Sequence, residues 1–285
     1  MKALAKFAIN NSLIVDIFGL LISGVVVHLV YMFWIDPSAS QLLYIAQEQG
    51  EPPPRTLAII LKDPEQEICV ILGLWCAWLW LFRYQLFMDE PHLLKTDFLD
   101  LRNKTAFDDV VLTELRRNVT EKLRDAPHLK LLGVIETVLN TLEPHRPISQ
   151  FKEASDIGAA ACDVYLEQLD AKLSLNKYIL WAIPSVGFLG TVRGIGEALG
   201  RADEALAGDI TGVANSLGVA FNSTFCALFI SLVLMLASYL LQGREERLVA
   251  NYKHFIAADL IGKLTSLAKA QASPRPLAPD DESYG

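Results

Sequence analysis

Two threonines in apolar segments are the side chains of this chain best suited to chemistry. Thr191 lies in the segment 178–200 and Thr224 in the segment 213–242, and a polar turn at 201–211 joins the two. An antiparallel helical hairpin would place both hydroxyls roughly 15 to 20 Å from the turn, because a helix rises about 1.5 Å per residue. That depth is near the middle of a bilayer, whose hydrocarbon core is about 30 Å thick. Two hydroxyls at one depth on neighbouring helices suggest a polar path for a cation and its water.

Each threonine shares a helical face with small or weakly polar residues. At about 100° per residue, these faces comprise Pro184, Gly187, Thr191, Gly194 and Ala198 on the first segment, and Val213, Leu217, Ala220, Thr224, Ala227 and Ser231 on the second. Small residues let transmembrane helices approach closely, so the faces are explained by packing alone. They also suit the lining of an ion path that leaves room for a partner helix. The pattern by itself leaves both interpretations open.

Arg193 and Glu197 are a second pair with potential chemistry, one helical turn apart in the same apolar segment. Arg193 points about 160° away from Thr191 on a helical wheel, so we do not place it in the same lining. We expect a structural ion pair near the outer membrane interface, either within the helix or between subunits. A role in selectivity or gating is the alternative.

Other kinds of site have little support in the sequence. No nucleophile–base set or phosphate-binding loop occurs, and the four cysteines form neither a CxxC motif nor a His/Cys cluster with metal-ligand spacing. We therefore expect no enzyme activity, no bound metal and no cofactor other than a transported ion. The net charge of -8 comes without a basic stripe, so no nucleic-acid partner is expected.

The elements that position these residues are membrane helices. Hydrophobic residues make up 52% of the 285 residues and gather in blocks long enough to span a bilayer. Lys and Arg are sparse between the first two blocks and between the last two, which predicts that both termini are cytoplasmic. The expected fold is an all-α membrane protein with four transmembrane helices and long cytoplasmic helical extensions. Its expected parts are a cytoplasmic N-terminus (1–12), spans at 13–35, 68–88, 177–200 and 212–242, a periplasmic loop (36–67), a cytoplasmic helical domain (89–176), a periplasmic turn (201–211), a cytoplasmic helix (243–272) and a disordered tail (273–285).

The hairpin resembles the MotA/TolQ/ExbB proton channel family. The resemblance rests on Ile183-Pro-Ser-Val-Gly-Phe-Leu-Gly-Thr-Val-Arg-Gly-Ile-Gly-Glu-Ala-Leu199 and on Val219-Ala-Phe-Asn-Ser-Thr-Phe-Cys-Ala-Leu228, and it is strong over about 180–245. It implies a homopentamer in the bacterial inner membrane around two copies of a single-span partner similar to MotB, TolR or ExbD. In such a complex a partner aspartate binds the ion, and ion flow drives rotation. The resemblance assigns the ion pathway to Thr191 and Thr224.

The expected function is therefore that of a channel-forming subunit, or stator, in an ion-driven inner-membrane motor, with protons favoured over sodium. The lining contains no obvious mid-membrane carboxylate, so the partner would have to supply one. The 89–176 domain would be free to engage a cytoplasmic rotor or effector. A non-conducting polytopic scaffold is the alternative from a different class. A secondary transporter is less favoured, because the spans show no repeated halves.

Overall fold

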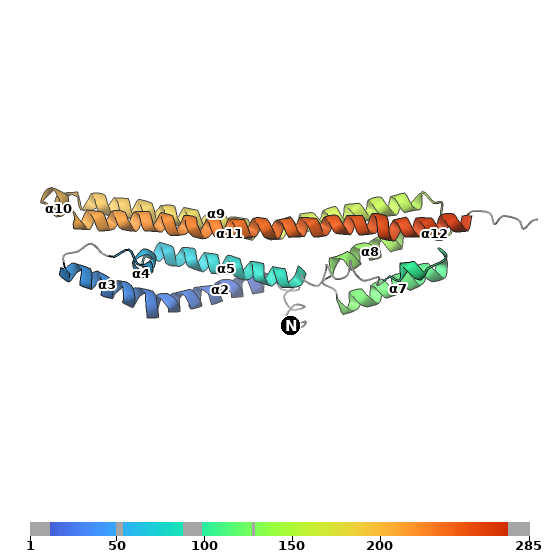
Figure 1. The fold of residues 1–285 in the computed structure, drawn as a ribbon, viewed down its shortest axis with the longest axis horizontal. Helices are drawn as coiled ribbons and strands as arrows, with labels where there is room; N and C mark the ends of the chain where they lie inside the picture. Colours follow the sequence, from blue (N-terminus) through green and yellow to red (C-terminus); the bar gives the residue numbers. More distant parts are fainter. Residues whose placement is uncertain (1–11, 50–53, 88–98, 127–128, 273–285) are drawn as a thin grey trace, which may run out of the picture. The chain divides into compact units, whose positions relative to one another are not determined.

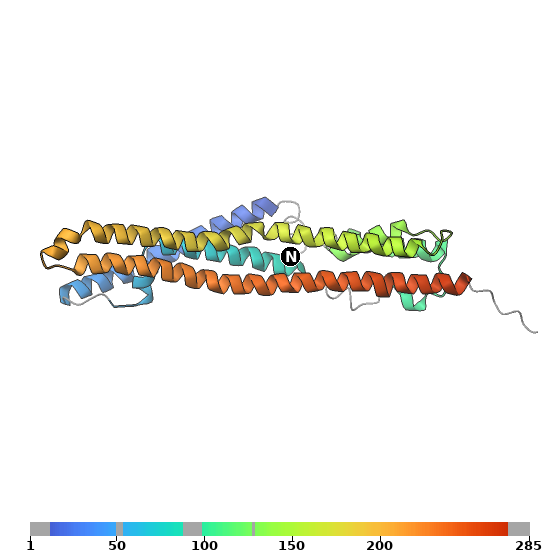
Figure 2. The same ribbon diagram turned by 90° about the horizontal axis from the view of Figure 1, so that it is seen from above.

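The computed structural model describes residues 12–49, 54–87, 99–126 and 129–272, and every regular element within these ranges is helical. The chain divides into two compact units. The first unit contains Met1–Gln85 and Lys172–Gln242, and the second contains Leu86–Ala171 and Gly243–Gly285. Two long helices contribute to both units: α9 (Gln150–Gly200) and α11 (Thr211–His254). Within each unit these two helices lie side by side (Figures 1 and 2).

The first unit begins with a helical run that continues beyond the first expected span. It consists of α2 (Ser12–Val30), the π-helical turn η1 (Tyr31–Ile35) and α3 (Asp36–Gln49). Pro37 has no backbone N–H to donate, and the wider π turn, in which Asp36 N–H bonds to Tyr31 O, accommodates it without ending the helix. The first part of the expected periplasmic loop is consequently helical.

The rest of the first unit packs α5 (Pro64–Phe87) against the hairpin of α9 and α11. The short helix α4 (Leu57–Leu61) precedes α5, and α10 (Ala202–Leu206) lies in the turn of the hairpin. A core between these helices contains Cys69, Cys76, Ile179, Ile183, Ala227 and Leu234. A smaller cluster of Val27, Tyr31 and Ile35 packs α2 and η1 against Leu61, Val70 and Ile71.

The second unit is a helical assembly with a larger apolar core. Its elements are η2 (Leu101–Asn103), α7 (Asp109–Asp125), α8 (Lys130–Thr141), the first part of α9, the last part of α11, η3 (Phe255–Ile261) and α12 (Gly262–Ala272). The Asp108 side chain caps α7 by accepting a hydrogen bond from Val111 N at 2.8 Å. Fully buried side chains in its core include Leu115, Leu132, Ile135 and Tyr252. This burial explains why the amphipathic stretches within 89–176 form helices here.

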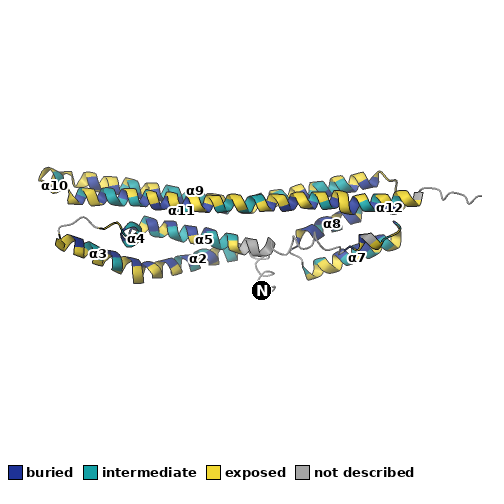
Figure 3. Cartoon of the chain, viewed as in Figure 1, coloured by how far each residue is buried: buried dark blue, intermediate teal, exposed yellow. Residues whose placement is uncertain are grey.

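Three helical runs among the described residues are long and apolar enough to cross a membrane: Ile14–Gln49, Gln150–Gly200 and Thr211–Gln271. The second expected span, 68–88, falls on α5, which is not among the three, and Met88 lies outside the described residues. Nearly all of the predicted cytoplasmic N-terminus and all of the predicted disordered tail also lie outside them. In the first unit many large apolar side chains are exposed (Figure 3). Such exposure is expected of a membrane-embedded surface.

Candidate ion pathway

The two threonines meet where α9 and α11 cross. Thr191 Oγ1 and Thr224 Oγ1 are hydrogen-bonded to each other. Thr191 Oγ1 also lies 3.1 Å from Ala220 O and 3.2 Å from Gly187 O, and Thr224 Oγ1 lies 3.3 Å from Gly187 O. Each hydroxyl has one proton, so it donates to only one of these oxygens at a time. Both threonines are partly exposed, and the pair can therefore exchange hydrogen bonds with a neighbouring group.

Two glycines allow the helices to come this close. A Cβ at Gly194 would lie 2.7 Å from both Ala220 N and Ser216 O, which are backbone atoms. A Cβ at Gly187 would lie 3.0 Å from Ser223 O. The side chain of any other residue would push the two backbones apart. These glycines are thus explained by close packing within one chain.

The other predicted lining residues are distributed along the same contact. Buried residues are Ala198, Ala220 and Ser231, while Pro184 and Leu217 are only partly buried. The Ser231 hydroxyl donates to Leu228 O at 3.1 Å, within its own helix. Of these small residues, Gly187, Gly194, Ala220 and Ala227 lie in the α9–α11 contact. Their role as a lining stays a prediction, with the partly exposed Thr191 and Thr224 as the hydroxyls that another chain can reach.

Arg193 is the centre of a separate polar cluster, directed away from the threonine pair towards the start of α5. Its Nε and Nη2 atoms each lie 2.7 Å from an oxygen of Glu65. Its Nη1 lies 3.0 Å from Glu197 Oε1, and its Nη2 lies 3.7 Å from Asp63 Oδ1. One guanidinium is thus surrounded by three carboxylates, and the pair with Glu65 is bidentate.

The sequence indicated the Glu197 contact but gave no sign of Glu65 as the closer partner. Asp63-Pro-Glu-Gln-Glu67 is a recognisable helix start, with acidic residues in the first turn. Glu65 and Arg193 are 128 positions apart, however, and no local pattern indicates which acidic residue a distant arginine will meet.

The pKa values of Asp63 and Glu65, at the start of α5, are shifted in opposite directions by their surroundings. Burial favours a higher pKa for Glu65, but hydrogen bonds from Arg193 and the backbone, with the arginine charge, outweigh it and the pKa is lowered. Burial raises the pKa of Asp63, and the charges of Lys62 and Arg193 oppose this only in part. Glu65 is therefore held ionised, whereas Asp63 takes up a proton more readily than an exposed aspartate.

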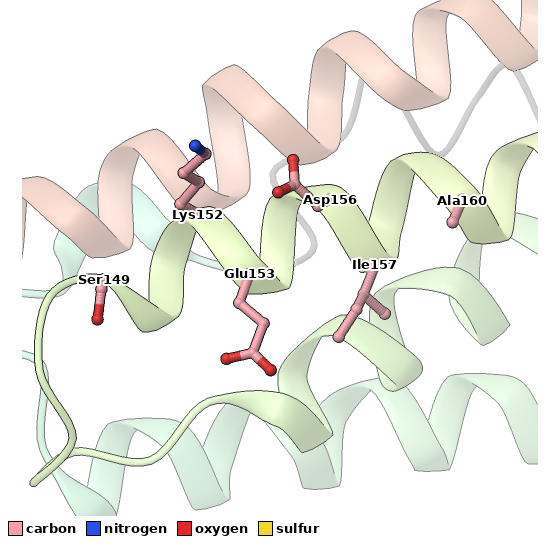
Figure 4. Close-up of a pocket in the computed structure, with 6 residues that line it drawn as sticks. All are labelled: Ser149, Lys152, Glu153, Asp156, Ile157 and Ala160. Atoms are coloured by element: carbon pink, nitrogen blue, oxygen red, sulfur yellow. The ribbon is translucent and has the colours of Figure 1, made fainter.

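Elsewhere, an open hollow in the second unit is lined by Ser149, directly before α9, and by Lys152, Glu153, Asp156, Ile157 and Ala160 at the start of α9 (Figure 4). Its charged side chains point in different directions and converge on no common point. No group of three or more His, Cys, Asp or Glu side chains within the described ranges is arranged to hold a metal ion.

Comparison with known proteins identifies the segment that carries the threonines. The model of the MotA/TolQ/ExbB proton channel family matches residues 126–254. This match supports the resemblance of the hairpin to that family. No curated protein and no solved structure matches the chain.

The MotA/TolQ/ExbB segment includes α8 and all of α9 and α11. It therefore contains Thr191, Thr224 and Arg193. Asp63 and Glu65 come from outside it. Two of the three carboxylates around Arg193 thus lie beyond the matched segment, and Glu197 lies within it.

Proposed function

We propose that this chain is the channel-forming subunit of a proton-driven motor complex in the bacterial inner membrane. The observation that carries the proposal is the hydrogen-bonded pair of Thr191 and Thr224 in a segment of the MotA/TolQ/ExbB proton channel family. Hydroxyls both donate and accept hydrogen bonds, so the pair can stabilise a proton carrier that passes along the hairpin.

The proposed topology has four spans, at 13–35, 68–88, 177–200 and 212–242, with both termini in the cytoplasm. The second span rests on α5, whose 24 residues give a helix of about 36 Å, enough to cross the hydrocarbon core. The scarcity of Lys and Arg in the two outward connections supports this orientation. The second unit is then cytoplasmic and offers a surface to a rotor or an effector.

The proposed complex is a ring of five chains around two copies of a single-span partner of the MotB, TolR or ExbD type. The threonines have hydroxyls but no titratable group, and the partner's aspartate would supply one. Protonation of that aspartate beside Thr191 and Thr224 would neutralise it and let it move past the ring. Ion flow would in this way be coupled to rotation of one part against the other.

The first prediction tests the threonine pair in membranes of cells that make the chain with its natural partners. Thr191→Val and Thr224→Val keep the side-chain shape and remove the hydroxyl, whereas the serine variants keep the hydroxyl. We expect proton uptake by inverted vesicles to fall at least tenfold in the valine variants and to persist in the serine variants, with assembly unchanged by native electrophoresis. Normal proton uptake in both valine variants would show that the pair is not on the ion path.

A non-conducting membrane scaffold is the second candidate, and the geometry of the hairpin favours it in one respect. Thr191 and Thr224 already bond to each other and to carbonyls of Gly187 and Ala220, so their hydroxyls have a complete packing role. Under this alternative the valine variants lose assembly together with any activity. The wild-type membranes would then also show no proton uptake that depends on the chain.

A further inference from the structure

One carboxylate oxygen in the Arg193 cluster stands apart from the others. Asp63 is only 8% exposed, and its Oδ2 atom has no hydrogen-bond partner among the residues that the structure describes. Both oxygens of Glu65 and one oxygen of Glu197 are by contrast bound by Arg193. A buried carboxylate oxygen without a partner is costly, and a proton relieves the cost by neutralising the group.

We propose that Asp63 is a proton-binding group at the outer entrance of the ion path, and that Arg193 makes this entrance selective for protons over Na⁺. The selectivity part rests on the proposed channel function. A proton needs one free oxygen, whereas a hard metal cation needs several oxygen ligands at once. Arg193 occupies both oxygens of Glu65 and one oxygen of Glu197, which takes away much of such a set, while the buried Asp63 Oδ2 has no partner among the described residues.

The charges that face Asp63 come from several elements. Lys62 precedes it in the chain, Glu65 lies in the first turn of α5 and Arg193 comes from α9, while the neutral Cys226 thiol comes from α11. The positive groups stabilise the carboxylate, and burial with Glu65 disfavours it. Burial is the largest of these effects, so the pKa of Asp63 is raised. Asp63 therefore exchanges its proton at a higher pH than an exposed aspartate does.

The cluster reaches the threonine pair through Gly190. A Cβ at this position would lie 3.1 Å from Glu65 Cγ and 2.6 Å from Ser223 Oγ, so α5, α9 and α11 all meet here. Gly190 and Ser223 directly precede Thr191 and Thr224 in the sequence. Glu65, in the cluster that contains Asp63, thus lies beside the residues that precede the two threonines.

The proton step is simple. A proton from outside water forms an O–H bond at Asp63 Oδ2 and neutralises the carboxylate. When that bond breaks, the carboxylate keeps the electron pair and the proton passes to a water molecule on the side of the hairpin. Arg193 remains charged throughout and stays on Glu65, whose two oxygens it already binds.

The first part of the test measures proton binding directly and needs no ion flow. The full chain in lipid nanodiscs is titrated while infrared difference spectra record the carbonyl stretch of protonated carboxyl groups. We expect a band that titrates above the pH of an exposed aspartate, disappears in Asp63→Asn, and remains in the control Asp203→Asn, which removes an exposed carboxylate from α10. A spectrum unchanged by Asp63→Asn overturns the proposal.

The second part tests selectivity by replacing choline with Na⁺ in the same titration. The midpoint of the wild-type titration should not move. Arg193→Gln frees the oxygens of Glu65 and Glu197, so Na⁺ can bind there in competition with the proton. In this variant Na⁺ should lower the apparent proton affinity tenfold or more. Circular dichroism and size-exclusion chromatography check that the variant folds. Glu65→Gln keeps the arginine and removes the negative charge and one of the two Glu65 oxygens, so it serves as a second variant and should not respond to Na⁺.

A Na⁺ response of the wild type, or none in a folded Arg193→Gln variant, overturns the selectivity role. The Asp63 band tests the proton-binding group, and the threonine variants test the ion-path function, so the two proposals can fail independently. If proton uptake is independent of the threonines while the Asp63 band is present, the ion-path function fails and the proton-binding group stands. If the band is absent while the threonine variants lose uptake, the reverse holds.

Discussion

At the scale of single residues, this hairpin separates two kinds of polar group. Thr191 and Thr224 form a neutral pair that faces along the α9–α11 contact, and Arg193 holds charged groups on another side of α9. Helical geometry explains the separation, because Arg193 is two positions from Thr191 and hence on a different face. A neutral hydroxyl pair and a charged cluster can therefore coexist on one helix without direct contact between Arg193 and the threonines.

The Glu65 carboxylate gives a prediction about acid stability. Its pKa is lowered from the ordinary value of 4.5, so its ion pair stabilises the fold at pH above that value and is lost as pH falls through the lower, folded-state pKa. We expect the loss to cost about 1 kcal/mol, less than a fully buried bidentate pair, because Arg193 is partly exposed to solvent. Thermal unfolding in detergent, followed by intrinsic fluorescence between pH 7 and pH 3, measures it.

Glu65→Gln is the matched variant for this experiment. It should already be less stable at pH 7 and should lose less on acidification, so the two curves converge at low pH. A constant difference between the curves down to pH 3 would show that the Glu65 charge does not contribute to stability.

The Asp63 carboxyl has the opposite effect on acid stability. Its pKa is raised, so its buried charge disfavours folding at neutral pH, and this cost is removed as pH falls.

At the scale of elements, the α9–α11 contact depends on which glycines face it. Gly194 and Gly196 lie two positions apart in α9, but a Cβ at Gly194 would meet backbone atoms at 2.7 Å, whereas one at Gly196 would meet nothing within 4 Å. Gly194→Ala should therefore destabilise the hairpin by about 1–3 kcal/mol through overpacking. Gly196→Ala should be neutral or stabilising by up to about 1 kcal/mol, because alanine favours the helix.

The stability of Gly194→Ala and of Gly196→Ala is measured by thermal unfolding, with the wild type in the same detergent as the reference. Equal stability of the two variants would mean that α9 and α11 do not pack as closely as this geometry requires. Because Gly194→Ala also moves the Ala220 backbone, whose carbonyl accepts a bond from Thr191, it should reduce proton uptake as well. Gly196→Ala should leave proton uptake intact.

Much of this element-scale picture follows from sequence, because it depends on local periodicity. Apolar blocks and a polar turn predict the hairpin, and the spacing of Thr191 and Thr224 from that turn predicts that they lie at one depth on neighbouring helices, though not that their hydroxyls are in contact. The helical continuation through Pro37 could not be predicted, because it depends on a π turn that absorbs the missing N–H. The contact of Glu65 with Arg193 could not be predicted either, because it depends on how α5 packs against α9 and no local pattern indicates it.

At the scale of the whole molecule, the membrane-type helices are poorly covered by their own chain. In the three candidate spans no more than 28% of the most apolar window is buried. Large apolar side chains such as Phe188, Phe221 and Tyr239 are more than 60% exposed. Lipid can cover such surfaces. In the proposed ring, neighbouring chains would cover the side of the hairpin that presents Thr191 and Thr224.

The last prediction concerns the assembly that provides this cover. The chain has a mass of 31.6 kDa, and native mass spectrometry from lipid nanodiscs should give a fivefold multiple of it, with two copies of a single-span protein in preparations from the natural host. A ring places each threonine pair beside a central partner, whereas a monomer leaves the hydroxyls facing lipid. The valine and serine variants of Thr191 and Thr224 should both keep this stoichiometry, since the proposed role of the hydroxyls is in the ion path and not in assembly. A monomer or an open series of masses would contradict the ring, because only closed symmetry gives one defined stoichiometry.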